Sequence, residues 1–227
     1  MARRPNRNIP PPPKPKINPR TAERIINNLS EEELLYRTIW YEANGEGLLG
    51  MALVANAIFN RKDIIDKGVR IGLFQAKDKT IKGILTGKNQ FEPVTGNKRV
   101  ISGLNASEKE KVTEAIALAS DKRLLENEIK NEVEDISKEN LLSLLNATGF
   151  RSLNAKPDRS QDVNVVTFKG HKFNTAGNKD KSLVELEIDR NTPTPKEKPT
   201  KEESRSIMDF MKKLLGVNEA AASTVDD

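Results

Sequence analysis

The chain has 227 residues, a length that suits one core of moderate size with tails and excludes two large domains. It carries 38 lysines and arginines against 33 aspartates and glutamates, a net charge of +5. A basic surface of this kind suits polyanions such as nucleic acid, an anionic glycan or an acidic protein. With no cysteine and a single histidine, the chain can form no disulfide or thiolate zinc site, and we expect no metal and no cofactor.

Residues 1–20 combine basic side chains with the proline run Pro10–Pro13. Consecutive prolines favour an extended polyproline II arm. This arm is either a solubilising tail or a contact for DNA or neighbouring proteins. It contains no apolar segment of the signal-peptide type, so no signal peptide is expected.

A short helix is expected over residues 21–29, and a longer one begins after Ser30. Ser30 is a residue type that caps helix N-termini, and Glu33 follows it by three residues, which is the spacing of a capping box. The apolar residues that follow fall on one helical face, which ends at Glu42. A break just after Glu42 is predicted by residues that adopt positive φ or cap helix ends: Asn44, Gly45 and Gly47.

Residues 48–59 are almost wholly apolar or small, which predicts the most buried helix of the domain. The stretch is short and is interrupted by Gly50 and Asn56, so no membrane span is expected. Asn60 and Arg61 end this apolar run and are expected to fix the fold.

Four features are predicted between residues 80 and 146. A short helix is expected over 80–85, and an extended piece over Gln90–Pro93, because a residue before proline is kept out of the helical region. Ser107 and Glu110 have the spacing of another capping box. The charged, leucine-containing stretch 121–146 predicts a helical hairpin, either an insertion used for docking or an extension of the core.

Alternation with period two predicts strands over 163–168, 170–173 and 182–188. A small antiparallel sheet beside a helical body indicates the α+β class. We therefore expect one domain over 21–190. After it we expect a proline-containing linker over 191–200, an amphipathic docking helix over 201–216 and a tail over 217–227.

The segment Tyr41–Gly47, followed by Gly50–Arg61, resembles the opening of the SleB-type cell-wall hydrolases, the spore-cortex lytic enzyme-like family. In that family a Glu-Ala-x-Gly-Glu turn precedes a Gly-x-x-x-Val-Ala-x-x-x-x-Asn-Arg helix. Later segments are similar in the same order: Gln90–Val94, Ala147–Pro157 and Gly170–Phe173. The resemblance covers residues 34–174 and implies a mainly helical, lysozyme-like domain with a small antiparallel sheet.

Cleavage of the MurNAc-GlcNAc bond of peptidoglycan needs a carboxyl group that protonates the leaving oxygen, with a pKa raised by apolar surroundings. Glu42, at the end of an apolar helical face, is the catalytic candidate. The resemblance implies lytic transglycosylation. One glutamate acts first as an acid and then as a base on the C6 hydroxyl, which gives a 1,6-anhydro product.

Other residues are candidates for substrate contacts, and several have a second interpretation. Glu46 is able to orient the turn or cap the next helix, and less readily to act as a second carboxylate. Phe91 is either a sugar platform or a core residue, and His171 either bonds substrate or is structural. The whole set is Glu46, Gln90, Phe91, Glu92 and His171.

The resemblance, together with the absence of an export signal, favours a bacteriophage protein that is carried in the virion and acts in the host periplasm or cell wall. Its partners are then peptidoglycan and other virion proteins, contacted through the 1–20 arm and the 201–216 helix. The alternative is a structural or adaptor virion protein on the same fold, without turnover, whose basic arm contacts neighbours or DNA.

Overall fold

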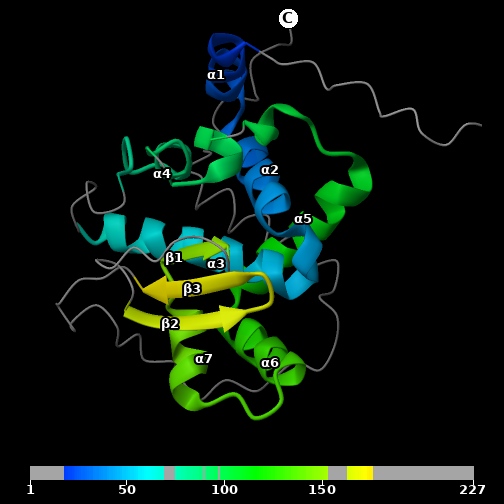
Figure 1. The fold of residues 1–227 in the computed structure, drawn as a ribbon, viewed down its shortest axis with the longest axis vertical. Helices are drawn as coiled ribbons and strands as arrows, with labels where there is room; N and C mark the ends of the chain where they lie inside the picture. Colours follow the sequence, from blue (N-terminus) through cyan, green and yellow to red (C-terminus); the bar gives the residue numbers. More distant parts are fainter. Residues whose placement is uncertain (1–17, 69–74, 89, 97, 153–162, 176–227) are drawn as a thin grey trace, which may run out of the picture.

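The computed structural model describes residues 18–68, 75–88, 90–96, 98–152 and 163–175. Over these residues the chain is mainly helical, with one three-stranded antiparallel sheet, which confirms the α+β class (Figure 1). The N-terminal half contains α1 (Pro19–Asn28), α2 (Glu31–Ala43), η1 (Asn44–Glu46), α3 (Gly47–Asp66), α4 (Ile81–Leu85) and η3 (Glu92–Gly96). The remaining elements are η4 (Arg99–Ile101), α5 (Ala106–Ser120), α6 (Lys122–Glu132), α7 (Lys138–Leu145), β1 (Gly149–Ser152), β2 (Val163–Phe168) and β3 (His171–Thr175).

The helix starts follow local capping chemistry. Ser30 caps α2 as predicted, its hydroxyl accepting a 3.1 Å hydrogen bond from the Glu33 amide. α1 begins at Pro19, two residues before the expected start, because Asn18 caps it. The capping box predicted for Ser107 is wrong in position: Asn105 and Glu108 form it, with reciprocal hydrogen bonds of 2.9 and 2.8 Å.

α3 is the central helix, and its residues from Leu49 to Arg61 are all buried. It packs against α2 and α5, and Figure 1 shows it crossing behind the sheet. Two asparagines interrupt its apolar surface because they hold the end of α7. The amide of Asn56 donates to the Leu145 carbonyl at 3.0 Å, and that of Asn60 donates to the Leu145 and Ala147 carbonyls at 2.9 and 2.8 Å. Buried side chains thus satisfy carbonyls that a helix terminus leaves unpaired.

The predicted hairpin over 121–146 forms two helices, α6 and α7. Their apolar side chains belong to the main core: Leu125, Ile129, Leu141, Leu144 and Leu145. α7 packs against β2 and β3, below the sheet in Figure 1. Of the two interpretations given to this stretch, extension of the core therefore describes its packing.

The sheet has the order β1-β3-β2, with both neighbouring pairs antiparallel. Val166 and Phe168 of β2 are buried, whereas Val165 beside them is 39% exposed, so the period-two pattern separates a core face from an outer face. Lys169 and Gly170 connect β2 to β3, and His171 is the first residue of β3.

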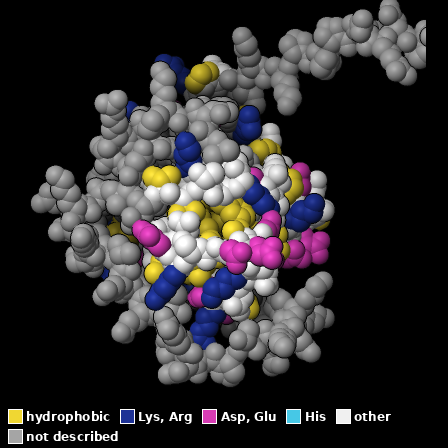
Figure 2. Space-filling view, turned by 60° about the horizontal axis from the view of Figure 1, so that its bottom comes forward, with side chains coloured by type: hydrophobic (Ala, Val, Ile, Leu, Met, Phe, Trp, Pro, Cys, Tyr) yellow, Lys and Arg dark blue, Asp and Glu magenta, His cyan; other side chains and the backbone are white. Residues whose placement is uncertain are grey.

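Several expected segments lie outside the described residues: most of the 1–20 arm, the 182–188 strand, the 191–200 linker, the 201–216 helix and the 217–227 tail. Within the described ranges, no helix combines the length and the apolar character that crossing a bilayer requires. Figure 2 views the end of the molecule near α6 and α7, where described basic and acidic side chains surround an apolar area. On this face the positive charge is therefore not gathered into one patch.

Candidate active site

Three segments that are distant in the sequence meet around the C-terminal end of α2. Glu42 lies in the last turn of α2 and is electrostatically coupled to His171 of β3, Glu92 of η3 and Arg61 of α3. Glu46, in η1, contacts His171 directly. Gln90 is joined to Arg61 by a hydrogen bond. The tertiary fold thus brings the predicted site residues into one neighbourhood.

Glu42 is half-buried and has an unusual proton affinity. Its pKa is raised from the ordinary value of 4.5 to about 7, chiefly because burial disfavours the carboxylate. The positive charge of His171 lowers this pKa, and so do a hydrogen bond from the Glu92 backbone and the charge of Arg61. The negative charge of Glu92 raises it further. A carboxyl group of this kind exists in both protonation states near neutral pH, as a group that first gives and then takes a proton must.

Arg61 is a buried positive charge at the base of the site. Its Nε donates to the Thr148 carbonyl, and its Nη1 donates to Oε1 of Gln90 at 2.9 Å. The guanidinium also lies 5.0 Å from the centre of the Phe91 ring. Burial lowers the pKa of Arg61 to about 10, and the charge of Glu42 opposes that change.

These contacts agree with the expectation that Arg61 fixes the fold. They also give it an electrostatic effect on Glu42 that the sequence interpretation missed. The available signal was that Arg61 is the first charged residue after the uncharged run 47–60.

The expected extended piece at residues 90–93 is wrong for its second half, because Glu92–Gly96 forms a helical turn. The Phe91 carbonyl accepts hydrogen bonds from the Val94 and Thr95 amides at 3.1 and 2.8 Å. Phe91 itself has no exposed surface, so its ring supports the site from within the core and has no face open to a sugar. Glu92 is exposed and stands beside Glu42.

Glu46 has a different role from the predicted helix cap. It occupies the residue before α3, but its side chain makes no capping hydrogen bond. Instead, Oε1 contacts Nδ1 of His171, and the carboxylate packs against Gly50 and Gly170. The glycines decide this arrangement, because a Cβ atom at either position would overlap the Glu46 side chain.

His171 is 7% exposed and is surrounded by aromatic rings. The Phe150 ring meets it edge-on, with centroids 5.5 Å apart and planes at 83°, and the Phe173 centroid lies 6.1 Å away. Within the described ranges, no three acidic, histidine or cysteine side chains are grouped to hold a metal ion. The raised pKa of Glu42 and the neighbouring charges of His171, Glu92 and Arg61 suit this arrangement to proton transfer by a carboxyl group.

Comparison of the chain with models of protein families, with curated proteins and with solved structures gives no significant match to any of them.

Proposed function

We propose that this chain is a peptidoglycan-cleaving lytic transglycosylase of the SleB type, with Glu42 as its single acid and base. The proposal includes a lysozyme-like origin for the helical body and its small sheet. The substrate bond is the MurNAc-GlcNAc linkage of the glycan strand.

The observation that carries the proposal is the convergence of separate sequence segments on Glu42. The Glu42–Gly47 turn, the Gln90–Glu92 segment and the strand that begins at His171 each resemble a part of the SleB pattern, and they surround one carboxyl group. More than 40 residues separate each segment from the next, so their proximity does not follow from chain connectivity. The raised pKa of Glu42 is the property that the chemistry requires.

In the proposed reaction, protonated Glu42 donates its proton to the glycosidic oxygen as the bond from that oxygen to C1 of the muramoyl sugar breaks. The resulting carboxylate then accepts the proton of the C6 hydroxyl while the C6 oxygen bonds to C1. The products are a 1,6-anhydromuramoyl end and a new free hydroxyl, and Glu42 is protonated again. One carboxyl group suffices because the sugar hydroxyl replaces water as the nucleophile.

We further propose a bacteriophage virion as the setting, with the 1–20 arm and the 201–216 helix contacting other virion proteins. The composition of both segments supports this proposal: the arm is basic and proline-rich, and the apolar residues between 207 and 215 recur at the spacing expected for one face of a helix. DNA contact by the arm belongs to the same proposal.

The test is digestion of purified peptidoglycan by the full chain, with mass analysis of the products. We expect muropeptides that are lighter by one water than hydrolysed ones, and a loss of about 10²–10⁴-fold in rate for Glu42→Gln. Glu23→Gln on the exposed surface of α1 is the matched control and should retain full activity. If wild type binds the wall or DNA in a salt-sensitive manner but releases no fragments, the adaptor alternative replaces the enzyme.

A further inference from the structure

The Glu46 carboxylate and the His171 imidazole contact each other beside Glu42, and both are largely buried. Oε1 of Glu46 contacts Nδ1 of His171, and the two side chains are only 13% and 8% exposed. Within the described residues, neither Nδ1 nor the other oxygen of Glu46 has a regular hydrogen bond. The contact between the two side chains is therefore the polar interaction that compensates their burial.

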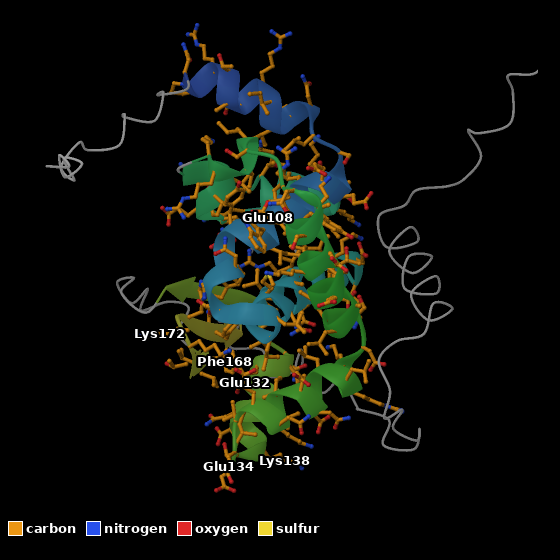
Figure 3. The ribbon with its side chains drawn as sticks, turned by 90° about the vertical axis from the view of Figure 1, so that its right-hand side faces the viewer. Glu108, Glu132, Glu134, Lys138, Phe168 and Lys172 are labelled. Atoms are coloured by element: carbon orange, nitrogen blue, oxygen red, sulfur yellow. The ribbon has the colours of Figure 1, made fainter. Side chains whose placement is uncertain are left out.

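Residues of α3 and of the β2–β3 turn position Glu46 against His171. Gly50 of α3 and Gly170 of the β2–β3 turn leave the space that the Glu46 carboxylate fills. Lys169, in the same turn, donates a 3.0 Å hydrogen bond to the Glu46 carbonyl and forms an ion pair with Glu132 of α6. Figure 3 shows Glu132 beside Phe168 at this junction, and Nζ of Lys169 lies 5.3 Å from the Phe168 ring centre. Lys169 thus ties the turn that leads into His171 to the helical turn η1 that contains Glu46.

The His171 ring packs against two aromatic rings. Phe150 meets it edge-on from β1, and Phe173 packs against it from two residues further along β3. Glu46, in η1, contacts Nδ1 of the same ring. When one ring nitrogen is fixed by an acceptor, the proton of a neutral imidazole resides on that nitrogen.

The charged groups around the pair come from five elements. Glu42 of α2, Arg61 of α3 and Glu92 of η3 face the same region, and Lys169 and Glu132 lie behind the turn. The charges that act most strongly on Glu42 are those of His171, Glu92 and Arg61. Glu46 is held against His171.

We propose that Glu46 and His171 act as one positioning unit, in which the Glu46 carboxylate holds the Nδ1 proton of His171 and stabilises the positive ring that faces Glu42. Neither residue is then a substrate contact. The consequence for catalysis rests on the proposed function, but the unit itself does not. The unit stabilises the carboxylate form of Glu42, which is the form left after Glu42 has donated its proton. It therefore keeps the pKa of Glu42 lower than burial alone would set it.

The direction in which the Glu42 pKa changes in Glu46→Gln distinguishes this proposal from direct repulsion between the Glu46 and Glu42 carboxylates. If Glu46 acted on Glu42 directly, Glu46→Gln would remove a negative neighbour, and the pKa of Glu42 would fall. If Glu46 acts through His171, the same change removes the counter-ion of the ring, and the pKa of Glu42 rises. His171→Gln should raise it as well, because the opposing positive charge is lost.

The experiment is an NMR titration of the full chain with ¹³C at the glutamate carboxyl carbon and ¹⁵N in histidine. Glu42→Gln identifies the Glu42 signal, and His171 needs no assignment because it is the single histidine. We expect the neutral ring to carry its proton on Nδ1. We expect the Glu42 pKa to rise by about one pH unit in Glu46→Gln and in His171→Gln.

The double variant completes the cycle. In the His171→Gln background, adding Glu46→Gln should not raise the Glu42 pKa further. A proton on Nε2 of the neutral ring, or a Glu42 pKa that is unchanged or lower in Glu46→Gln, overturns the proposal. These signals do not depend on glycan cleavage, so an inactive protein with the expected titrations refutes the proposed function alone. An active protein without them refutes the positioning unit alone.

Discussion

Nη1 of Arg61 donates a 2.9 Å hydrogen bond to Oε1 of Gln90, and through it the end of α3 is connected to the segment that leads into η3. The Gln90 side chain also approaches the Lys88 carbonyl, at 3.4 Å from Nε2. Gln90 is thereby engaged at both ends of its amide. These contacts hold the Gln90 side chain against the protein, and its contact with substrate stays a prediction.

Arg61→Lys should destabilise the fold although it preserves the charge. Lysine lacks the planar fork that contacts Thr148, Gln90 and the Phe91 ring together, so buried acceptors lose their donors. We expect a loss of about 2–4 kcal/mol in the free energy of unfolding, measured by urea denaturation. Arg24→Lys, on the exposed side of α1, is the matched control, and an equal effect of the two changes would contradict this account.

Glu42→Gln should increase stability, and the gain should depend on pH. The folded pKa of about 7 lies above the ordinary value of 4.5, so the favourable contribution of Glu42 is complete below about pH 4.5 and is lost as pH rises through 7. At pH 8 the variant should be more stable by about 1–3 kcal/mol, since glutamine carries no charge to bury. The measurement is thermal or urea unfolding at pH 5 and pH 8. A gain that is the same at both pH values would show that Glu42 titrates normally.

The proposed reaction should become slower at alkaline pH. The first step uses protonated Glu42, so kcat/KM is expected to fall about tenfold per pH unit above the free-enzyme pKa of about 7. Turbidity loss of a wall suspension across pH 5–9 provides the profile. A constant rate up to pH 9 would be inconsistent with Glu42 as the acid.

Gly50→Ala should disturb the site, whereas Gly45→Ala should not. A Cβ atom at Gly50 would overlap the side chain of Glu46, while a Cβ atom at Gly45 meets nothing within 4 Å. Alanine ordinarily stabilises a helix interior by up to about 1 kcal/mol, so a net loss of about 1–2 kcal/mol at Gly50 would reflect the overlap. Unfolding free energies and the His171 NMR signals measure both effects. Greater stability of Gly50→Ala than of wild type would show that Glu46 has room to move.

Asn60→Ala should be among the more damaging polar changes. It leaves the Leu145 and Ala147 carbonyls without the donor that pairs them, although Asn56 still reaches Leu145. We expect a loss of about 2–3 kcal/mol by urea denaturation. Asn131→Ala, at an exposed position in α6, provides the comparison and should change stability by less than about 0.5 kcal/mol.

Sequence patterns predicted the features that depend on local interactions. The cap at Ser30, the break after Glu42 and the buried run of α3 follow from short-range periodicity and from residue types that end helices. The alternation before Lys169 likewise predicted β2, with one face buried. The capping box was predicted at Ser107 and forms at Asn105, which has the same spacing to Glu108.

By itself the sequence determined the α+β class, the helix whose last turn contains Glu42 and the identity of the residues with ionisable groups. Only the tertiary structure decided that Glu46 contacts His171 instead of capping α3, that Phe91 is buried and that Arg61 acts on Glu42. The physical reason is the separation along the sequence between the residues that interact. Helix and strand patterns are encoded within a few residues, whereas burial and charge coupling depend on groups 19 to 129 positions from Glu42 along the chain.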